Sequence, residues 1–420
     1  MMETKIFDYG MNGEGIAKEN GKVLMINNAL VDEVVEVELQ HEFNNYAIGQ
    51  TKTIIKSSPN RQQPLCPYFY QCGGCQLQHM NYNEQLKLKT NLIKKSIKKI
   101  TNLNVDVNNT VPCSKQYGYR NKMSFSVFKT DCGLLKYNSK DIVNITHCPL
   151  ATDDINKILN IFKEFINLYE YDCIKNLVVR GIDNQYLVGV VTSKHVELKK
   201  LLSTLQSQFV DIGLFEIINN RKDSVVLSGK TTHIGGIKTI NINNFDLNYS
   251  VDLLGFHQTN IDIQNKIYKD VLKFINPNSV VINGFSGQGL LTAIVAKKAK
   301  HVIGIEINAS SHNSAEKLKQ HNNLKNITNI CGDFYKHFKT EKSKIDTIIL
   351  DPTKKGCGTN VMNEINGVEN IIYISCNPIA LSKDLNVIKD YYTIEEITPY
   401  DMFPNTINVE TLVKLKKKTL

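Results

Sequence analysis

The last third of the chain alternates short apolar strands with helix-like or loop segments, and this pattern constrains the fold more than any other feature. The segments are SVVING (279–284), HVIGIEIN (301–308), ITNICGD (327–333), IDTIILD (345–351), NIIYISC (370–376), YTIEEITPY (392–400) and VETLVKLKK (409–417). Parallel strands need a long crossover connection, so regular alternation is typical of a doubly wound, mostly parallel sheet. We therefore predict an α/β fold for residues 251–420.

A glycine-bearing turn follows the first of these strands. In the segment NGFSGQG (283–289), Gly287 and Gly289 permit a tight turn and close approach of a ligand. The second strand brings Glu306, near the spacing at which an acidic side chain binds a ribose hydroxyl. The third glycine of a dinucleotide site is missing, which favours S-adenosylmethionine (SAM) over NAD. Asp333 and Asp351 end the next two strands and should face the same crevice.

The strand NIIYIS leads into Cys376, Asn377 and Pro378, so a thiol stands where a buried strand emerges into a turn. A cysteine at such a position is more often a small core residue. The alternative is a nucleophile held at the rim of the sheet. The strand and the turn alone leave both readings open.

The first two thirds of the chain do not show this regular alternation of strands and helices. Strand-like segments KVLMI, EVVEVELQ and YAIGQTKTII predict a small β-barrel over residues 1–57, and Pro59 and Pro64 mark a linker. The segment EQLKLKTNLIKKSIKKI (84–100) has the periodicity of a lysine-rich helix. Strand-like segments MSFSVF, CGLLKY, NLVVRG, YLVGVVT and SVVLSG, with helices near 153–169 and 195–208, predict an α+β middle domain. We place that domain at 58–250.

Four of the ten cysteines form a group in the sequence. Cys66-x5-Cys72-x2-Cys75 lies in CPYFYQCGGCQLQH, and Cys148 follows in HCP. Four thiolates suit either tetrahedral zinc or a [4Fe–4S] cluster. Zinc ribbons usually bring two paired C-x2-C units, so a triplet with one distant ligand leans towards iron–sulfur. The alternative is that these cysteines are buried residues with no common ligand. The C-G-G-C motif in a loop argues against that alternative.

Composition limits the function classes. The net charge of +9 fits a polyanionic partner without demanding one. The sequence has neither an apolar run long enough to span a membrane nor a secretory signal at its start, so we expect a cytoplasmic protein without a membrane partner. Ten cysteines in such a chain indicate thiols, metal binding or catalysis, not a disulfide framework.

These motifs together resemble the SAM-dependent RNA (uracil-5-)-methyltransferase family, in the iron–sulfur branch that methylates 23S ribosomal RNA. The motifs that carry the resemblance are CPYFYQCGGCQLQH with HCP, YRNKMSFSV, GFHQTN, FSGQG, LDPTKKG, YISCNPIALSKDL and DMFPNTINVETLVKL. The resemblance implies a Rossmann-like class I methyltransferase domain at 251–420. It also implies a TRAM domain, an OB-like RNA-binding barrel, at 1–57, and a [4Fe–4S] cluster in the middle domain.

Carried over residue by residue, the resemblance implies a function for each motif. Cys376 would be the nucleophile that attacks C6 of uracil, and Glu410 the base that removes the C5 proton. The SAM site would comprise Gln258, Phe285, Gly287, Glu306, Asp333 and Asp351. The cluster ligands would be Cys66, Cys72, Cys75 and Cys148. The sequence departs from the family pattern at four positions, which are Asn283, Leu290, Thr353 and Lys354.

The predicted activity is transfer of a methyl group from SAM to C5 of a uridine in 23S rRNA. We expect a monomer that binds no DNA and flips the target base out of its RNA. Expected RNA contacts are the barrel, the helix at 86–99, Arg120 and Lys122. The alternatives are the same reaction on tRNA and a non-catalytic RNA-binding ribosome-assembly factor. A radical-SAM enzyme would need C-x3-C-x2-C, and the spacing C-x5-C-x2-C argues against it.

Overall fold

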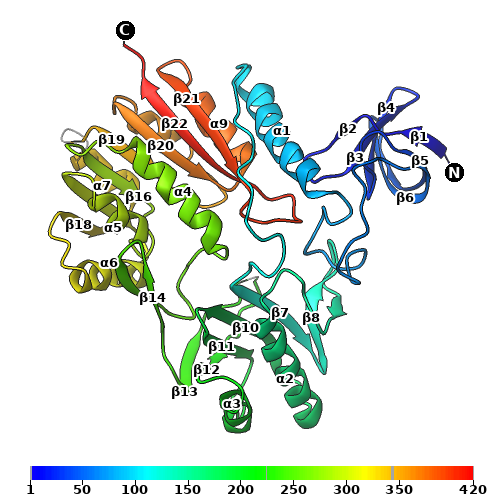
Figure 1. The fold of residues 1–420 in the computed structure, drawn as a ribbon, viewed down its shortest axis with the longest axis horizontal. Helices are drawn as coiled ribbons and strands as arrows, with labels where there is room; N and C mark the ends of the chain where they lie inside the picture. Colours follow the sequence, from blue (N-terminus) through cyan, green and yellow to red (C-terminus); the bar gives the residue numbers. More distant parts are fainter. Residues whose placement is uncertain (1, 224, 342–344, 420) are drawn as a thin grey trace.

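The structure, a computed structural model, describes residues 2–223, 225–341 and 345–419. Figure 1 shows three sheet-containing parts, with the N-terminal sheet on one side, the C-terminal sheet on the other and the middle sheet below them in this view. Among the described residues, no helix has the length and apolar character needed to span a membrane.

The N-terminal part is a six-stranded sheet in the order β1-β5-β6-β4-β3-β2. Its strands are β1 (Met2–Lys5), β2 (Asp8–Tyr9), β3 (Gly15–Glu19), β4 (Lys22–Asn27), β5 (Val34–Glu42) and β6 (Tyr46–Lys56). Register shifts in the β5–β6 pair bend these two strands. Small and β-branched residues such as Ala17, Ile26 and Val35 fill the core that the sheet encloses. The predicted strands of this region are confirmed.

The predicted lysine-rich helix is confirmed as α1 (Tyr82–Thr101). Asn81 caps its start by accepting a hydrogen bond from the Glu84 N–H, and Asn102 ends it in the left-handed conformation. Its apolar face, including Ile93 and Ile97, packs into the core beneath the C-terminal sheet. Figure 1 shows α1 beside α9 (Pro378–Ile388). The helix therefore joins the segment that follows the N-terminal sheet to the C-terminal part.

The middle part is a seven-stranded sheet in the order β13-β12-β11-β10-β7-β8-β9. Its strands are β7 (Lys122–Phe128), β8 (Asp131–Leu135), β9 (Ile142–Asn144), β10 (Ile174–Ile182), β11 (Gln185–Thr192), β12 (Asp211–Ile218) and β13 (Lys230–Gly236). Helices α2 (Asp153–Tyr169) and α3 (Lys199–Gln206) accompany it, both within the predicted ranges. The strand predicted at SVVLSG is wrong, because residues 225–229 are irregular and β13 begins at Lys230. Ser224 lies outside the described residues.

A two-stranded hairpin, β14 (Ile240–Asn244) with β15 (Leu247–Val251), leads to α4 (Ile261–Phe274) and the C-terminal part. There a seven-stranded sheet has the order β18-β17-β16-β19-β20-β22-β21. The strands are β16 (Val280–Gly284), β17 (His301–Glu306), β18 (Ile327–Cys331), β19 (Thr347–Leu350), β20 (Asn370–Ser375), β21 (Tyr392–Tyr400) and β22 (Glu410–Lys417). The other helices are α5 (Leu290–Ala296), α6 (Ala309–His321), α7 (Phe334–Glu341) and α8 (Thr359–Glu364).

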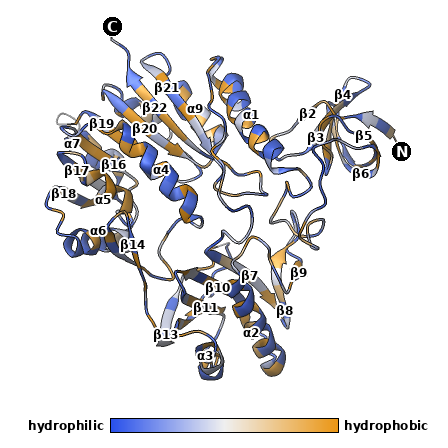
Figure 2. Cartoon of the chain, viewed as in Figure 1, coloured by the Kyte–Doolittle hydropathy of each residue, from blue (hydrophilic) through white to orange (hydrophobic). Residues whose placement is uncertain are grey.

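Alternate residues of these strands fill two separate cores, one on each face of the sheet. Val281 and Val302 pack with α4 and α5, whereas their neighbours Ile282 and Ile303 pack with α7 and α1. Figure 2 shows hydrophobic residues concentrated along these strands, while α4 and α6 turn mostly hydrophilic residues outward. Strands β16 to β20 are parallel to one another. The predicted doubly wound, mostly parallel sheet is confirmed.

Candidate active site

A cavity of about 720 Å³ opens at the carboxyl ends of the parallel strands. Loops that follow β16, β17, β19 and β20 contribute to its wall, and so do α4, α6 and the middle part. The predicted site residues on its wall are Gln258, Phe285, Gly287, Glu306, Asp351, Cys376 and Glu410. Asp333 does not line it; its carboxylate accepts a hydrogen bond from the Lys336 N–H in the first turn of α7.

Cys376 follows the last residue of β20, and the turn after it is fixed by Asn377. The Asn377 side chain caps α9 by accepting hydrogen bonds from the Ile379 and Ala380 N–H groups. The thiol is half-buried, not packed into the core. Burial, followed by the negative charge of Glu410, raises the pKa of Cys376 to about 11, and the nearby Lys354 opposes the shift. The thiol is therefore accessible from the cavity and protonated in the free protein.

Glu410 is the first residue of β22, which runs antiparallel to β20. The start of β22 thus lies beside the end of β20, and the pairing of Ser375 with Thr411 brings Cys376 and Glu410 to the same rim. Glu410 is buried, and this burial, with the charge of Asp351, raises its pKa well above the usual value. Burial also raises the pKa of Asp351 to about 7. Two carboxyl groups and a thiol therefore share one cavity wall.

A buried carboxylate holds the loop that carries Lys354. Asp384 on α9 accepts hydrogen bonds from the N–H groups of Cys357 and Gly358 and from the Tyr373 hydroxyl, at 2.7, 3.1 and 2.6 Å. The side chain of Asn377 donates to the Lys354 carbonyl at 2.8 Å. The loop therefore keeps a defined position beside Cys376. Asp384 was missed in the sequence because an acidic residue within a helix reads as a solvated one.

The glycine turn after β16 has the backbone conformation that the sequence predicts. Phe285, Gly287 and Gly289 have φ values of +60°, +55° and +81°. The Gly287 N–H donates to the Glu306 carboxylate at 2.8 Å, which ties the turn to the end of β17. The space that a Cβ of Gly287 would occupy is empty to 4 Å, so a ligand can approach the backbone closely.

Two amide side chains to which the sequence assigned no role have unpaired atoms at this cavity. The Oδ1 atom of Asn283 is buried and unpaired, while its Nδ2 donates to Thr292 at 2.9 Å. Both polar atoms of the Gln264 amide, on α4, are buried and unpaired. Unpaired buried amides are costly, so these groups are suited to bind a polar ligand. A glutamine on an amphipathic helix carries no sequence signal of that role.

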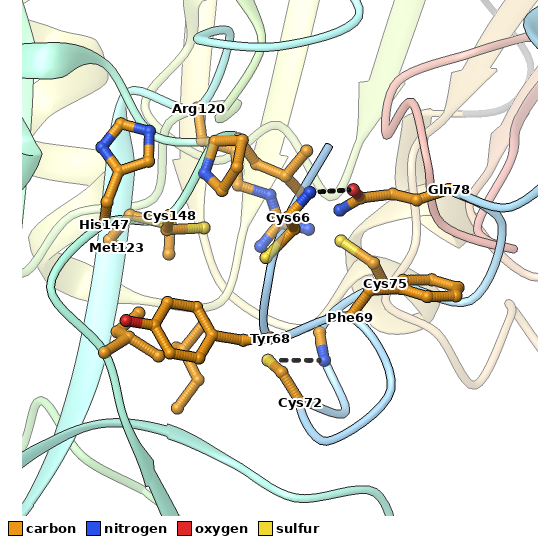
Figure 3. Close-up of a pocket in the computed structure, with 15 residues that line it drawn as sticks. Cys66, Tyr68, Phe69, Cys72, Cys75, Gln78, Arg120, Met123, His147 and Cys148 are labelled. Carbon is orange, nitrogen blue, oxygen red and sulfur yellow. Dashed lines mark hydrogen bonds between the residues drawn. The ribbon is translucent and has the colours of Figure 1, made fainter. Parts of the chain in front are cut away.

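The four grouped cysteines surround a second, smaller cavity of about 30 Å³. In Figure 3 the sulfur atoms of Cys66, Cys72, Cys75 and Cys148 lie around a common space, with Tyr68 and Arg120 beside them. The Gly74 N–H donates to the Cys72 sulfur, and the Cys66 N–H donates to Gln78. Burial raises the pKa of the Cys66 and Cys72 thiols, and that of Cys75 to about 12. The sequence-predicted thiols are thus brought together.

No three His, Cys, Asp or Glu side chains among the described residues form a group that could hold a single metal ion as they stand. The four sulfur atoms line one cavity.

Arg120 lines both cavities. Burial alone would lower the pKa of Arg120, but the Tyr119 hydroxyl and the thiols of Cys75 and Cys148 raise it. The guanidinium lies over the Phe403 ring, 5.8 Å from its centroid. Lys122 is half-buried, and burial together with the charge of Arg180 lowers its pKa to about 8.

Comparison with known proteins links this architecture to enzymes that modify RNA. Residues 333–418 match a family model described as tRNA (Uracil-5-)-methyltransferase. The chain is 31% identical to an uncharacterized RNA methyltransferase of Caldanaerobacter subterraneus subsp. tengcongensis, over 99% of this chain and 98% of that protein. It is 30% identical to one of Clostridium tetani, over 96% and 94%.

One solved structure shares the fold over nearly the whole chain. It is the tRNA (uracil-54, C5)-methyltransferase of Pyrococcus abyssi in complex with S-adenosyl-L-homocysteine. The TM-score is 0.78 at 23% identity, and the alignment covers 99% of each chain. The fold is thus that of a class I SAM methyltransferase with a large sheet-rich N-terminal region.

Proposed function

Because the chain belongs to the RNA (uracil-5-)-methyltransferase family and is a SAM-dependent RNA methyltransferase, we propose that it methylates C5 of a uridine in 23S rRNA with Cys376 as nucleophile and Glu410 as base. The observation that carries this proposal is that both side chains line one cavity, although they come from different strands of the sheet. The glycine turn borders the same cavity, so methyl donor and target base can meet there.

Cys376 begins the reaction by bonding to C6 of the uracil, which makes C5 electron-rich enough to accept a methyl group. The high pKa of its thiol means that a positive charge must stabilise the thiolate in the complex. Lys354 provides one such charge at the cavity wall. Bound SAM supplies a methyl group on a positively charged sulfur atom.

Glu410 then takes the proton from C5, and the electrons of that bond restore the C5–C6 double bond as the Cys376 sulfur leaves. A carboxylate with a raised pKa suits this role, because it is a stronger base than an exposed glutamate. Its burial also excludes water, which would otherwise compete for the proton.

The residues present fit SAM. The open approach at Gly287 and the carboxylate of Glu306 suit the nucleoside, with Phe285 as an apolar surface beside it. The unpaired Asn283 Oδ1 can accept a hydrogen bond from an amino group. We assign Gln258 and Asp351 to the same site, because both line the cavity. Asp333 lies outside the lining, so we assign it at most an indirect contribution.

We also propose that the four cysteines hold a [4Fe–4S] cluster, with zinc as the alternative. The donor set fits, since four thiols face one cavity. A bound cluster would brace the segments from which its ligands come, and methyl transfer itself needs no electron from it. We further propose that the six-stranded N-terminal sheet is a TRAM-like RNA-binding barrel.

Transfer RNA is the second candidate substrate. Nearly the whole chain shares its fold with an enzyme that acts on tRNA. The four-cysteine cavity favours ribosomal RNA in our interpretation. To decide, the protein is incubated with SAM and either unmodified 23S rRNA or unmodified tRNA, and 5-methyluridine is mapped by mass spectrometry. We expect methylation of 23S rRNA. Methylation of tRNA alone would overturn the substrate assignment, and absence of 5-methyluridine from both would overturn the proposed reaction.

Two variants test the roles of the residues in the same assay. Cys376→Ala should reduce turnover by at least a thousandfold, because no covalent bond to C6 can form. Glu410→Gln should accumulate a covalent protein–RNA adduct, detectable as a slow-migrating band on a denaturing gel. Near wild-type turnover in either variant would contradict the mechanism.

A further inference from the structure

The segment between β21 and β22, residues 401–409, leads directly into Glu410. Residues that lie outside the C-terminal sheet form hydrogen bonds with this segment. Glu410 is buried at the first position of β22, so the backbone that precedes it helps to set where its carboxylate lies. Asn405, in the middle of the segment, is fully buried and has a φ of +68°, in the left-handed region. The partners of Asn405 show what fixes the segment.

The four-cysteine loop provides the first partners. Directly after Cys75, the N–H groups of Gln76 and Leu77 both donate to the Asn405 carbonyl oxygen, at 3.2 and 3.0 Å. The Gln76 side chain adds a bridge: its Nε2 donates to the Gly73 carbonyl at 2.9 Å, and its Oε1 accepts from the Ile407 N–H at 3.3 Å. One amide thus connects the turn between Cys72 and Cys75 to the segment that ends at Glu410.

Helix α1 closes the arrangement from the other side. Gln85 donates from Nε2 to Asn405 Oδ1 at 3.2 Å and accepts from the Asn405 N–H at 2.9 Å. The Asn405 Nδ2 donates to the Gln116 carbonyl at 2.8 Å. The carbonyl, the N–H and both side-chain polar atoms of Asn405 are therefore hydrogen-bonded, which holds this residue in a single position. We call Gln76, Gln85 and Asn405 the amide clasp.

We propose that the amide clasp positions Glu410, so that the four-cysteine loop acts on the reaction by aligning the base that removes the C5 proton. Gln76 and Asn405 are positioning residues, since neither lines the cavity that holds Cys376 and Glu410. The inference rests on the proposed function, in which Glu410 acts after Cys376 has bonded to C6. It concerns the protein's own hydrogen bonds and holds whichever metal the cysteines bind.

The clasp should affect one step in particular. In the methylated adduct, C6 is bonded to the Cys376 sulfur, and C5 carries both the methyl group and a hydrogen. Glu410 takes that hydrogen as a proton, its bonding electrons form the C5–C6 double bond, and the C6–S bond breaks to release the thiolate. A displaced Glu410 slows this step but neither the attack by Cys376 nor the methyl transfer. Loosening the clasp should therefore accumulate methylated adduct.

The experiment uses the full-length protein and three variants. Gln76→Leu removes both side-chain hydrogen bonds at similar size, and Gln76→Glu keeps the acceptor for Ile407 but loses the donor to Gly73. Gln71→Leu is the matched control, because Gln71 is exposed in the same loop. Each protein reacts with unmodified RNA and SAM labelled in its methyl group. The labelled protein–RNA adduct is measured on a denaturing gel, beside free 5-methyluridine and the affinity for SAM.

We expect at least tenfold more adduct at steady state in Gln76→Leu, an intermediate level in Gln76→Glu, a wild-type level in Gln71→Leu and unchanged affinity for SAM. If Gln76→Leu loses SAM binding through misfolding, the adduct level of Gln76→Glu decides alone. A wild-type adduct level in the deciding variant would overturn the inference. If the wild-type protein itself yields no 5-methyluridine, the proposed function is wrong. The inference, which rests on it, is then wrong as well.

Discussion

At the residue scale, the active cavity gathers groups that disfavour one another's charge. Cys376, Asp351 and Glu410 all have raised pKa values, and Lys354 is the cation that opposes the shifts of Cys376 and Glu410. A cationic ligand bound beside these groups would lower their pKa values by favouring the charged forms. The sequence identified the three residues one by one from their motifs. Their pKa shifts could not be predicted, because they depend on how deeply the folded chain buries each group.

The raised pKa of Asp351 makes stability depend on pH. The usual pKa of an aspartate is about 4, and burial raises that of Asp351 to about 7. Between these values the folded protein keeps a proton that the unfolded chain has lost. Its stabilising effect is full at low pH and is lost as the pH rises through 7. Asp351→Asn cannot ionise, so we expect its melting temperature to exceed that of the wild type by roughly 2 °C or more at pH 8.

The advantage of Asp351→Asn should shrink at pH 5, where the wild-type carboxyl is protonated in the folded state. Differential scanning fluorimetry of the ligand-free proteins measures both values. Asp390→Asn is the control, because Asp390 is exposed. An advantage that does not change between pH 5 and pH 8 would contradict the assigned shift.

At the scale of elements, α1 was predicted with nearly its observed ends, yet one of its lysines has a different role from the one expected. Lys89 is fully buried and pairs with Asp401, and its ammonium also donates to the Phe403 carbonyl at 3.0 Å. It is therefore unavailable to RNA and instead ties α1 to the segment before Glu410. Helical periodicity treats every lysine as solvated, so the sequence could not distinguish Lys89 from the exposed lysines of this helix.

Breaking this ion pair should destabilise the protein more than removing it altogether. Lys89→Met leaves the Asp401 carboxylate buried without its cation, which typically costs about 3–5 kcal/mol. The double variant Lys89→Met with Asp401→Leu replaces both charges by apolar groups and should recover most of the loss. Urea unfolding followed by circular dichroism compares the midpoints, with Lys99→Met as the control on the exposed face of α1. Equal midpoints for the single and double variants would contradict this account.

At the scale of the whole molecule, the sequence predicted the C-terminal sheet well, because each buried strand is an apolar run that ends in a recognisable motif. It predicted the middle sheet less well: β12 was not identified, and SVVLSG was assigned as a strand. The sequence could not predict the contacts between the cysteine loop and the segment before Glu410. Gln76 and Asn405 lie far apart in the chain, and neither belongs to a periodic pattern. The predicted domain limits at 57 and 250 remain a prediction, and α1 packs on the C-terminal part.

The cysteine cavity makes a prediction that involves no activity assay. Protein purified without oxygen should contain close to four iron and four sulfide per chain if the [4Fe–4S] proposal is right. Cys75→Ser should lower both severalfold, whereas Cys173→Ser, a buried cysteine of the middle part, should not. Elemental analysis and the visible absorption spectrum report the metal. One zinc per chain without sulfide would replace the cluster by the zinc alternative.

The antiparallel course of β22 has a consequence for the tolerance of the site. β22 lies between β20 and β21 and is hydrogen-bonded to both, with Ser375 opposite Thr411 and Tyr400 opposite Glu410. A slip by one residue would turn every side chain of β22 to the opposite face and would break two ladders at once. The pairing of β22 with both neighbours therefore fixes the face of the sheet on which Glu410 lies, and the amide clasp fixes the segment that leads into it.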